Sequence, residues 1–460
     1  MARVSPGEHV TVDLVIRTDR VVVPDGGVHA CAIAVTDGAV VGILPRDAAV
    51  TAEHEIELAD DEVLLPGLVD THVHVNEPGR TDWEGFASAT AAAAAGGVTT
   101  LIDMPLNSIP PTVDVAALSV KRAAAAAQCH VDVGFWGGAV PGNRPSLRAL
   151  HNAGVFGFKA FLVDSGVSEF PPLSSSDLAD VLADVAALDA LLIVHAEDAD
   201  ALAAAPACDG RSYAAFVASR PAAAEQAAVE RLIAAARVAG ARVHVVHLSS
   251  REALAAVNAA RAEGVRMTAE TCPHYLTLTV TDVPDGATQF KCCPPIRDAT
   301  HRDALWRGLA DGDIDLVVSD HSPAPPALKN LDDGNFGTAW GGIASVQLGL
   351  PVVWSAARSH GHKLGDVVGW MARGPAQLVG LTSKGRIALG ADADLIAFAP
   401  DEAFTVDPTR LQHRHPLTPY AGRDLTGVVR RTWLRGHEVY SDTGGLLGEP
   451  RGRLLERVDG

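Results

Sequence analysis

Residues 67–75 read GLVDTHVHV, a short apolar run that ends in polar side chains. Seven similar runs follow, at 98–104, 131–137, 155–162, 191–196, 243–249, 266–271 and 314–320. Alanine-rich stretches with helical spacing, such as 175–190 and 223–240, lie between them. Eight buried strands that alternate with helices predict an α/β fold with a (β/α)8 TIM-type barrel. A doubly wound open sheet is the alternative, but it would carry a glycine-rich phosphate loop after its first strand, and the sequence has none there.

The two ends of the chain differ from the middle. The first 65 residues and the region from about 385 onward both consist of short strand-like runs broken by DG turns. We expect the ends to pair into one small β-sandwich domain, 1–65 plus 385–460, with the barrel at 66–384 inserted between them. A prior of about 150 residues per domain would suggest three domains, but a barrel uses about 250 residues alone.

Composition limits the classes of partner. The chain is 48% hydrophobic and 20% charged, which is typical of a globular protein, and its net charge is -19. This charge disfavours nucleic acid and anionic membranes as partners. None of the six cysteines forms a CxxC pair, the N-terminal sequence has no apolar signal core, and no apolar run is long enough to span a bilayer. The sequence therefore predicts a soluble cytoplasmic protein with a small-molecule partner.

Polar side chains gather where the predicted strands end, which is the catalytic face of such a barrel. Five strands supply His72, His74, Lys159, His195, His247 and Asp320. His72 and His74 are two residues apart on one strand, so both imidazoles point to the same side. A single histidine at a strand end is more often structural than a ligand. Six such residues at one barrel mouth predict a metal site.

The other histidines are given no ligand role. His244 lies three residues before His247, so alternation predicts that it faces away from the lumen, toward the helices. Residues expected at the surface are His9, His29, His54, His413, His415 and His437. Helix or loop positions away from the strand ends are expected for His130, His151, His301, His360 and His362. His274 and His321 are candidates for supporting contacts.

Lys159 lies inside an apolar strand, where a bare charge is costly to bury. A lowered pKa favours the neutral amine, which adds carbon dioxide to form a carbamate, and two carbamate oxygens can bridge two metal ions. Two close ions lower the pKa of a shared water. Asp320 can ligate one ion and also carry a proton between the nucleophile and a leaving nitrogen. The implied chemistry is metal-assisted hydrolysis of an amide, ester or phosphoester.

The stretch PGLVDTHVHVNEPG (66–79), together with Lys159, resembles the amidohydrolase superfamily, in its branch of dihydroorotases, hydantoinases and allantoinases. The resemblance covers nearly the whole chain and is strongest to allantoinases, through stretches such as AETCPHYL (269–276), KCCPPIRD (291–298) and VSDHSPAPP (318–326). It implies that His72 and His74 ligate one metal ion, that His195 and His247 ligate the other, that Lys159 is the N6-carboxylated bridge, and that Asp320 is ligand and acid/base.

Departures from the branch narrow the substrate. Dihydroorotases carry the motif HxHxxR, whose arginine binds a substrate carboxylate. In this chain Asn76 and Glu77 stand where that arginine would lie, so the arginine is missing. Hydantoinases have a tyrosine a few residues after the strand-four lysine. No tyrosine occurs in residues 160–165 of this chain. Ser165 and Gly166 are instead similar to allantoinases. The resemblance also implies backbone contacts to a cyclic ureide near Cys293 and Gly341. Ser322 and Asn107 are candidates for further polar contacts, with a purely structural role as the alternative. The group that stabilises the oxyanion stays open.

The leading expectation is hydrolysis of the hydantoin-ring amide of allantoin to allantoate. The alternatives are a hydantoinase- or dihydropyrimidinase-like hydrolase, and a non-catalytic scaffold. The expected cofactors are two divalent ions per subunit, zinc first, with cobalt, manganese or iron as alternatives. A homotetramer is implied by the resemblance alone.

Overall fold

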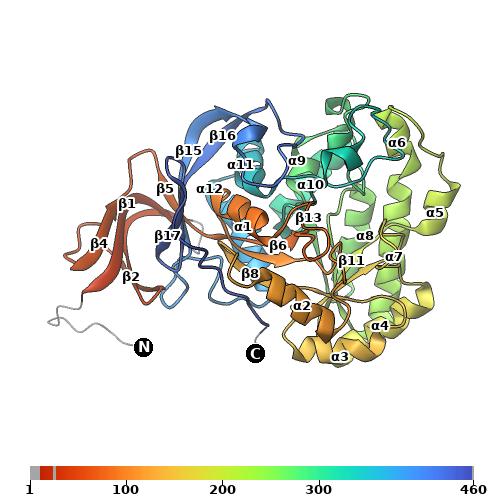
Figure 1. Ribbon diagram of the computed structural model, residues 1–460, viewed down its shortest axis with the longest axis horizontal. Helices are drawn as coiled ribbons and strands as arrows, with labels where there is room; N and C mark the ends of the chain where they lie inside the picture. Colours follow the sequence, from red (N-terminus) through yellow and green to blue (C-terminus); the bar gives the residue numbers. More distant parts are fainter. Residues whose placement is uncertain (1–10, 24–26, 458–460) are drawn as a thin grey trace.

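The computed structural model describes residues 11–23 and 27–457 (Figure 1). Its centre is a ring of parallel strands: β6 (Leu68–Val73), β7 (Val98–Asp103), β8 (Asp132–Phe135), β9 (Gly137–Gly138), β10 (Phe158–Phe161), β11 (Leu191–His195), β12 (Arg242–Val245), β13 (Met267–Thr271) and β14 (Leu316–Val317). Each of the eight predicted runs overlaps at least one of these strands, and the third run overlaps two, β8 and β9.

The ring closes through hydrogen bonds between its two sheets. The Phe156 N–H donates to the carbonyl of Phe135 at 3.0 Å, which joins the start of β10 to β8. On the other side the His74 N–H donates to the carbonyl of His321 at 2.8 Å, which joins the end of β6 to the segment after β14. The TIM-type barrel is therefore confirmed.

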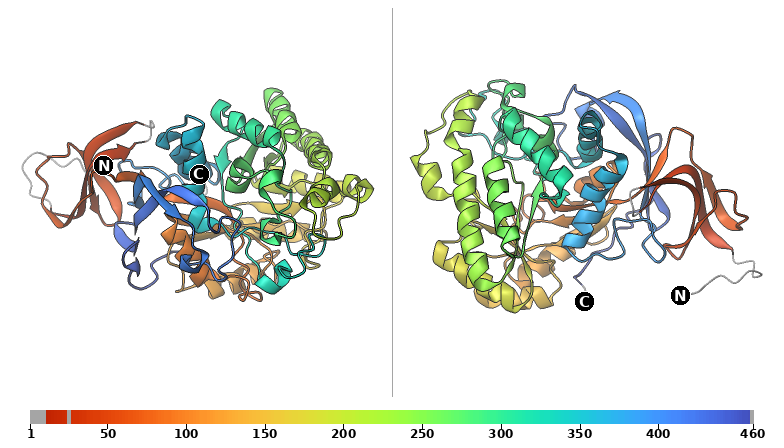
Figure 2. Two further views of the ribbon diagram at one scale, coloured as in Figure 1. Left: turned by 90° about the horizontal axis from the view of Figure 1, so that it is seen from above. Right: turned by 180° about the vertical axis from the view of Figure 1, so that it is seen from behind.

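Helices surround the ring (Figure 2). The principal ones are α1 (Phe86–Ala95), α2 (Val115–Ala125), α3 (Arg144–Asn152), α4 (Ser175–Ala187), α7 (Ala222–Ala239), α8 (Arg251–Ala262), α10 (Ala299–Asp311) and α11 (Gly349–Ser359). Shorter helices lie in the connections: α5 (Ala199–Ala204), α6 (Tyr213–Ser219), α9 (Pro273–Thr277), α12 (Leu364–Val368) and α13 (Gly374–Leu378). Helix α4 begins with a capping box, in which Ser174 and Asp177 satisfy each other's backbone N–H groups.

Both chain ends contribute to a second sheet beside the barrel. Its strands are β1 (Val12–Val22), β2 (Val28–Thr36), β3 (Ala39–Leu44), β4 (Ala52–Glu57), β5 (Val63–Pro66), β15 (Leu395–Thr405), β16 (Asp424–Leu434), β17 (His437–Ser441) and β18 (Gly445–Leu446). The link between the two ends is the antiparallel pairing of β5 with β15. Side chains from both ends, such as Ile16, Ile33, Leu395 and Trp433, share one core. Residues 1–10, 24–26 and 458–460, which the sequence assigns to this domain, lie outside the described residues.

A buried charge cluster fastens this sheet to the barrel. The Lys384 ammonium lies 2.7 Å from a carboxylate oxygen of Asp132 in β8 and 2.7 Å from one of Asp394, which directly precedes β15. Arg435 adds a second cation, 2.6 Å from Asp132. Because Asp394 and Arg435 come from the C-terminal part, Lys384 lies at the predicted boundary and Asp132 comes from the barrel, the cluster couples the two parts of the fold.

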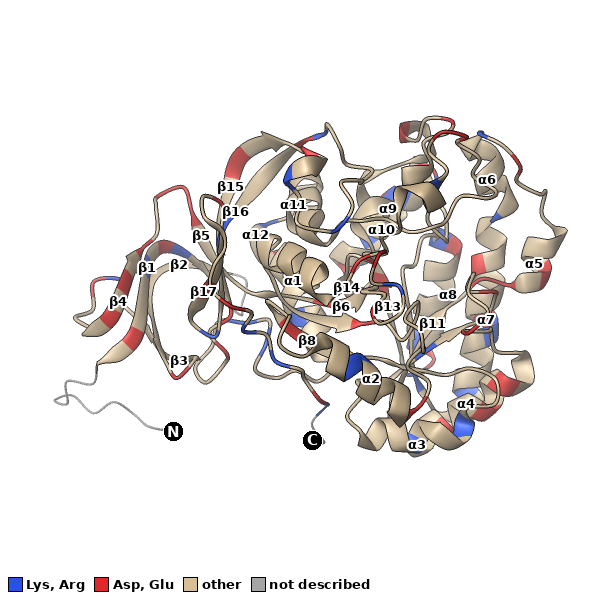
Figure 3. Cartoon of the chain, in the orientation of Figure 1, with Lys and Arg blue, Asp and Glu red and all other residues tan. Residues whose placement is uncertain are grey.

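Acidic and basic residues are interspersed over the outer helices α3, α4 and α7 (Figure 3). Within the described residues, no helix has both the length and the apolar character needed to cross a membrane.

Candidate metal centre

All six strand-end residues singled out in the sequence line one cavity of about 480 Å³ at the carboxyl ends of the barrel strands. This volume lies within the range of about 300–1,000 Å³ that is usual for small-molecule sites. His72 lies on β6, Lys159 on β10 and His195 at the end of β11. His74 directly follows β6, His247 lies two residues after the end of β12, and Asp320 lies three residues after the end of β14. The predicted convergence is therefore what the fold produces.

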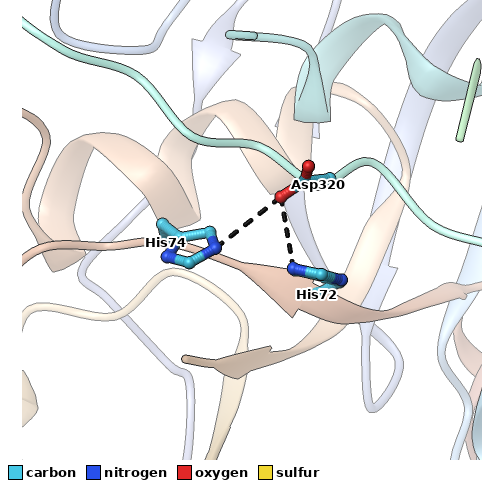
Figure 4. A group of neighbouring side chains, drawn as sticks. All are labelled: His72, His74 and Asp320. Atoms are coloured by element: carbon cyan, nitrogen blue, oxygen red, sulfur yellow. Dashed lines mark ion pairs between the residues drawn. The ribbon is translucent and has the colours of Figure 1, made fainter. Parts of the chain in front are cut away.

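His72, His74 and Asp320 form the first group of metal-binding type (Figure 4). One Asp320 oxygen lies 3.2 Å from His72 Nε2 and 3.6 Å from His74 Nε2. All three ligand-type atoms lie within 4.8 Å of one another. Asp320 has a φ of +44°, a left-handed conformation that is uncommon for a residue other than glycine and is frequent at functional sites.

His195 and His247 form the second group. His195 Nδ1 lies 3.0 Å from His247 Nε2, and His195 Nε2 lies 2.8 Å from a carboxylate oxygen of Glu197. Since the Glu197 carboxylate accepts a hydrogen bond from Nε2–H, the neutral His195 ring presents an unprotonated Nδ1 toward His247. The Phe161 ring stacks on His195 with centroids 4.8 Å apart, which fixes the plane of the imidazole.

Lys159 lies in the same cavity and is fully buried. Burial lowers the pKa of its ammonium to about 8, against partial opposition from Asp320 and Glu270. Within the described residues its Nζ makes no hydrogen bond, and it lies 4.9 Å from the centroid of the Phe161 ring. A buried amine without a partner is costly, so this nitrogen needs either a modification or a ligand.

The donor set fits divalent ions. In the described part of the chain, His72 Nε2 and His247 Nδ1 are also buried without a hydrogen-bond partner. Burial holds the pKa values of His74, His195 and His247 below the usual range for histidine. Metal binding requires neutral imidazoles, and these histidines are neutral in this environment.

Glu270 on β13 supports the first group and was not singled out in the sequence. One of its oxygens accepts from His72 Nδ1 at 2.5 Å, and the other lies 3.0 Å from His244 Nε2. Burial opposes ionisation of this carboxyl, but His72 and His244 outweigh it and hold its pKa below the usual range. The expected orientation of His244 was wrong. Its ring reaches into the barrel, because β12 ends at Val245 and His247 has a φ of +39°, so strict alternation does not extend to His247.

Glu197 supports the second group. Besides His195 it binds Arg220, whose Nε lies 3.0 Å from one carboxylate oxygen and whose Nη2 lies 2.5 Å from the other. Burial alone would raise the pKa of Glu197, but Arg220 and His195 bring it down to about 2. The sequence did contain a signal for both glutamates. Glu197 follows His195 by two residues, and Glu270 lies one residue before the end of its strand.

A further expectation that fails concerns His413, which is buried rather than at the surface. The centroids of the His413 and His321 rings lie 5.8 Å apart. His321 Nε2 lies 3.4 Å from a carboxylate oxygen of the buried Glu84. The segment that carries His413 folds back over the barrel, since the Arg414 N–H donates to Glu84 at 3.2 Å. His274 is also fully buried, and His9 lies outside the described residues.

The candidate substrate-binding residues Ser165, Gly166, Cys293, Ser322 and Gly341 all line the cavity, as does Asn107. The Ser165 hydroxyl donates to the carbonyl of Phe170 at 2.7 Å, so it also shapes its own loop. Within the described residues, the N–H groups of Cys293 and Gly341 make no hydrogen bond, which leaves them for a ligand.

Comparison with known proteins identifies the family. Residues 63–439 match the Amidohydrolase family. The chain belongs to the amidohydrolase family. It is 58% identical to the allantoinase of Streptomyces avermitilis over 97% of this chain and 99% of that protein, and 45% identical to the allantoinase of Saccharomyces cerevisiae over 87% and 88%. Among solved amidohydrolase structures, the L-hydantoinase (dihydropyrimidinase) of Arthrobacter aurescens is similar with a TM-score of 0.90 and 30% identity, over 97% of this chain and 100% of that one.

Proposed function

We propose that this protein is an allantoinase, a cyclic amidohydrolase that opens the hydantoin ring of allantoin to give allantoate. The observation that carries the proposal is the convergence of two histidine groups, Lys159 and Asp320 in one cavity of a family member that is similar to allantoinases along nearly its full length. Its structural similarity to hydantoinases agrees with a cyclic amide as the substrate class.

Two divalent ions would be held by these residues, with zinc as the expected metal. His72, His74 and Asp320 would hold one, and His195 and His247 the other. Lys159, carboxylated on Nζ, would bridge them, and its lowered pKa and unpartnered nitrogen support this role. When bound, the ions would supply Lewis acidity and lower the pKa of a water molecule.

Asp320 is proposed as the acid/base. Hydrolysis adds water to the ring carbonyl carbon, breaks the C–N bond and leaves a carboxylate and an N–H, with one proton released to solvent. Asp320 takes a proton from the attacking water and returns it to the ring nitrogen as the C–N bond breaks. Burial raises the pKa of this carboxyl above its ordinary value, which brings it closer to the range in which it can both accept and donate a proton.

The substrate would lie against Ser165, Gly166, Cys293, Ser322 and Gly341. The free N–H groups of Cys293 and Gly341 can donate to ureide carbonyl oxygens, and this contact does not depend on the side chain at either position. The loop of Gly341 is held by Lys291, whose Nζ donates to the carbonyl of Ala339 at 2.6 Å.

Purified protein should hydrolyse allantoin in preference to hydantoin and dihydrouracil. Rapid opening of hydantoin or dihydrouracil without turnover of allantoin would favour the hydantoinase- or dihydropyrimidinase-like alternative. Absence of hydrolysis, together with fewer than one bound ion per chain after metal-replete expression, would favour a non-catalytic scaffold.

Three expectations from the sequence stay predictions: a homotetramer, a cytoplasmic location, and the division into a barrel at 66–384 and a split β domain at 1–65 plus 385–460. Sedimentation of the purified protein tests the first. Limited proteolysis at the boundaries near residues 65 and 385 tests the third.

A further inference from the structure

The two proposed ion positions differ in the charge that supports them. His72 and His195 each direct one ring nitrogen into the cavity and the other to a buried glutamate. Such a carboxylate fixes the tautomer and orientation of a ligating histidine and increases its basicity. Glu270 therefore supports His72 in the same way that Glu197 supports His195, through a hydrogen bond to the ring nitrogen that points away from the cavity.

Their own partners differ. Glu270 contacts the rings of His72 and His244 and accepts from the His247 N–H at 3.4 Å. Within the described residues, Glu270 forms no ion pair with lysine or arginine. Glu197, in contrast, forms a two-pronged ion pair with Arg220. The first position thus has two carboxylates nearby, Glu270 and Asp320, that form no ion pair with arginine or lysine within the described residues, whereas Glu197 is paired with a guanidinium.

Arg220 also lines the cavity. Its Nη1 makes no hydrogen bond within the described residues, whereas Nε and Nη2 are engaged by Glu197. A positive charge at this place repels a divalent ion at His195 and His247 through Coulomb's law. The same side chain is within reach of whatever fills the cavity.

We propose that Glu270 and Glu197 are the positioning residues of the two ion positions, and that Arg220 makes the position at His195 and His247 the weaker one. This inference rests on the metal centre of the proposed function. It predicts that the two ions leave separately, the one at His195 and His247 first. It also predicts that Arg220 tunes the release of that ion without ligating it.

The test is stepwise removal of Co²⁺ from the loaded full-length protein by a chelator, followed by absorption and by metal analysis. The wild type should lose its ions in a fast and a slow phase. Glu197→Gln should speed the fast phase and Glu270→Gln the slow phase, each by about 10- to 100-fold, the usual effect of removing such a supporting carboxylate.

Substitutions of Arg220 are the decisive part of the test, because they leave the carboxylates of both Glu197 and Glu270 in place. Arg220→Gln should slow the fast phase, and Arg220→Lys should leave it close to that of the wild type. A purely structural role for Arg220 would give the opposite result, faster release in Arg220→Gln. The double variant Glu197→Gln/Arg220→Gln should recover part of the loss caused by Glu197→Gln, since the unpaired cation is gone.

Arg231→Gln is the matched control. Arg231 pairs at 2.7 Å with Asp198, the residue after Glu197, but this pair does not contact His195 or line the cavity. Its release phases should equal those of the wild type. A single release phase in the wild type, or faster release in Arg220→Gln, overturns the inference. Fewer than two ions in the wild type overturns the proposed metal centre instead. If Glu270→Gln does not fold, the Arg220 arm still decides.

Discussion

Lys159 combines full burial, a lowered pKa and a nitrogen without a hydrogen bond in the described part of the chain. We expect Lys159→Ala to lose bound metal and activity together, because it removes the bridge. Metal analysis and the allantoin assay on the same sample check this. Retention of either property by the variant would show that Lys159 does not bridge the ions.

The pKa of Lys159 gives a pH prediction. Carbon dioxide reacts with the neutral amine, and a pKa of about 8 makes that form increasingly abundant as the pH rises through 8. Uptake of metal by the metal-free protein in bicarbonate should therefore be faster at pH 9 than at pH 7. The comparison is made at a constant concentration of dissolved carbon dioxide. Equal rates at the two pH values would argue against a lysine that reacts after folding.

At the scale of strands, Asp70 joins the first barrel strand to the segment that carries Asp320. One carboxylate oxygen accepts from the His72 N–H and the other from the Ser319 N–H, both at 3.0 Å. Asp70→Ala leaves two buried donors unpaired and should lower the free energy of unfolding by about 2–6 kcal/mol, at about 1–3 kcal/mol for each group. Urea unfolding of the metal-free protein measures this effect. A loss below about 0.5 kcal/mol would contradict the bracing role.

The strands also show what the sequence could predict. Alternation predicted that His72 and His74 point to the same side, and both imidazoles do lie near one Asp320 oxygen, although the pairing of β6 with β7 is irregular between Asp70 and Val73. It failed for His244, since the chain leaves the strand before His247 and adopts a positive φ there. Alternation could not reveal the pairing of Glu197 with Arg220. Arg220 lies 23 residues farther along the chain, in the connection between α6 and α7, and only the tertiary fold brings it to Glu197. His413 was misplaced for a similar reason, since only the tertiary fold brings its loop onto Glu84 and His321.

At the scale of the whole molecule, Lys384 links the barrel to the sheet formed by the chain ends. Lys384→Met leaves the buried carboxylates of Asp132 and Asp394 without this cation, although Arg435 still reaches Asp132. Breaking a buried pair in this way typically costs about 3–5 kcal/mol. Denaturant unfolding should show this loss near pH 7.

The pH dependence of that loss follows from Asp394. Burial raises the pKa of its carboxyl above the ordinary value even with Lys384 present, and removal of the lysine raises it further. The variant's folded state therefore holds a proton more readily than its unfolded state, so the difference from the wild type should shrink as the pH falls toward 5. A difference that grows with acidity would contradict this sign. Arg231→Gln, which breaks a partly exposed pair, should cost less than about 1 kcal/mol.

The central claim for the molecule is that one cavity of this amidohydrolase holds two ions and opens the ring of allantoin. The most direct test measures allantoin hydrolysis and metal content on the same purified sample. We predict about two divalent ions per chain and formation of allantoate, with hydrolysis lost when a chelator removes the ions and restored when they are returned. Two bound ions without any turnover of allantoin would contradict the account.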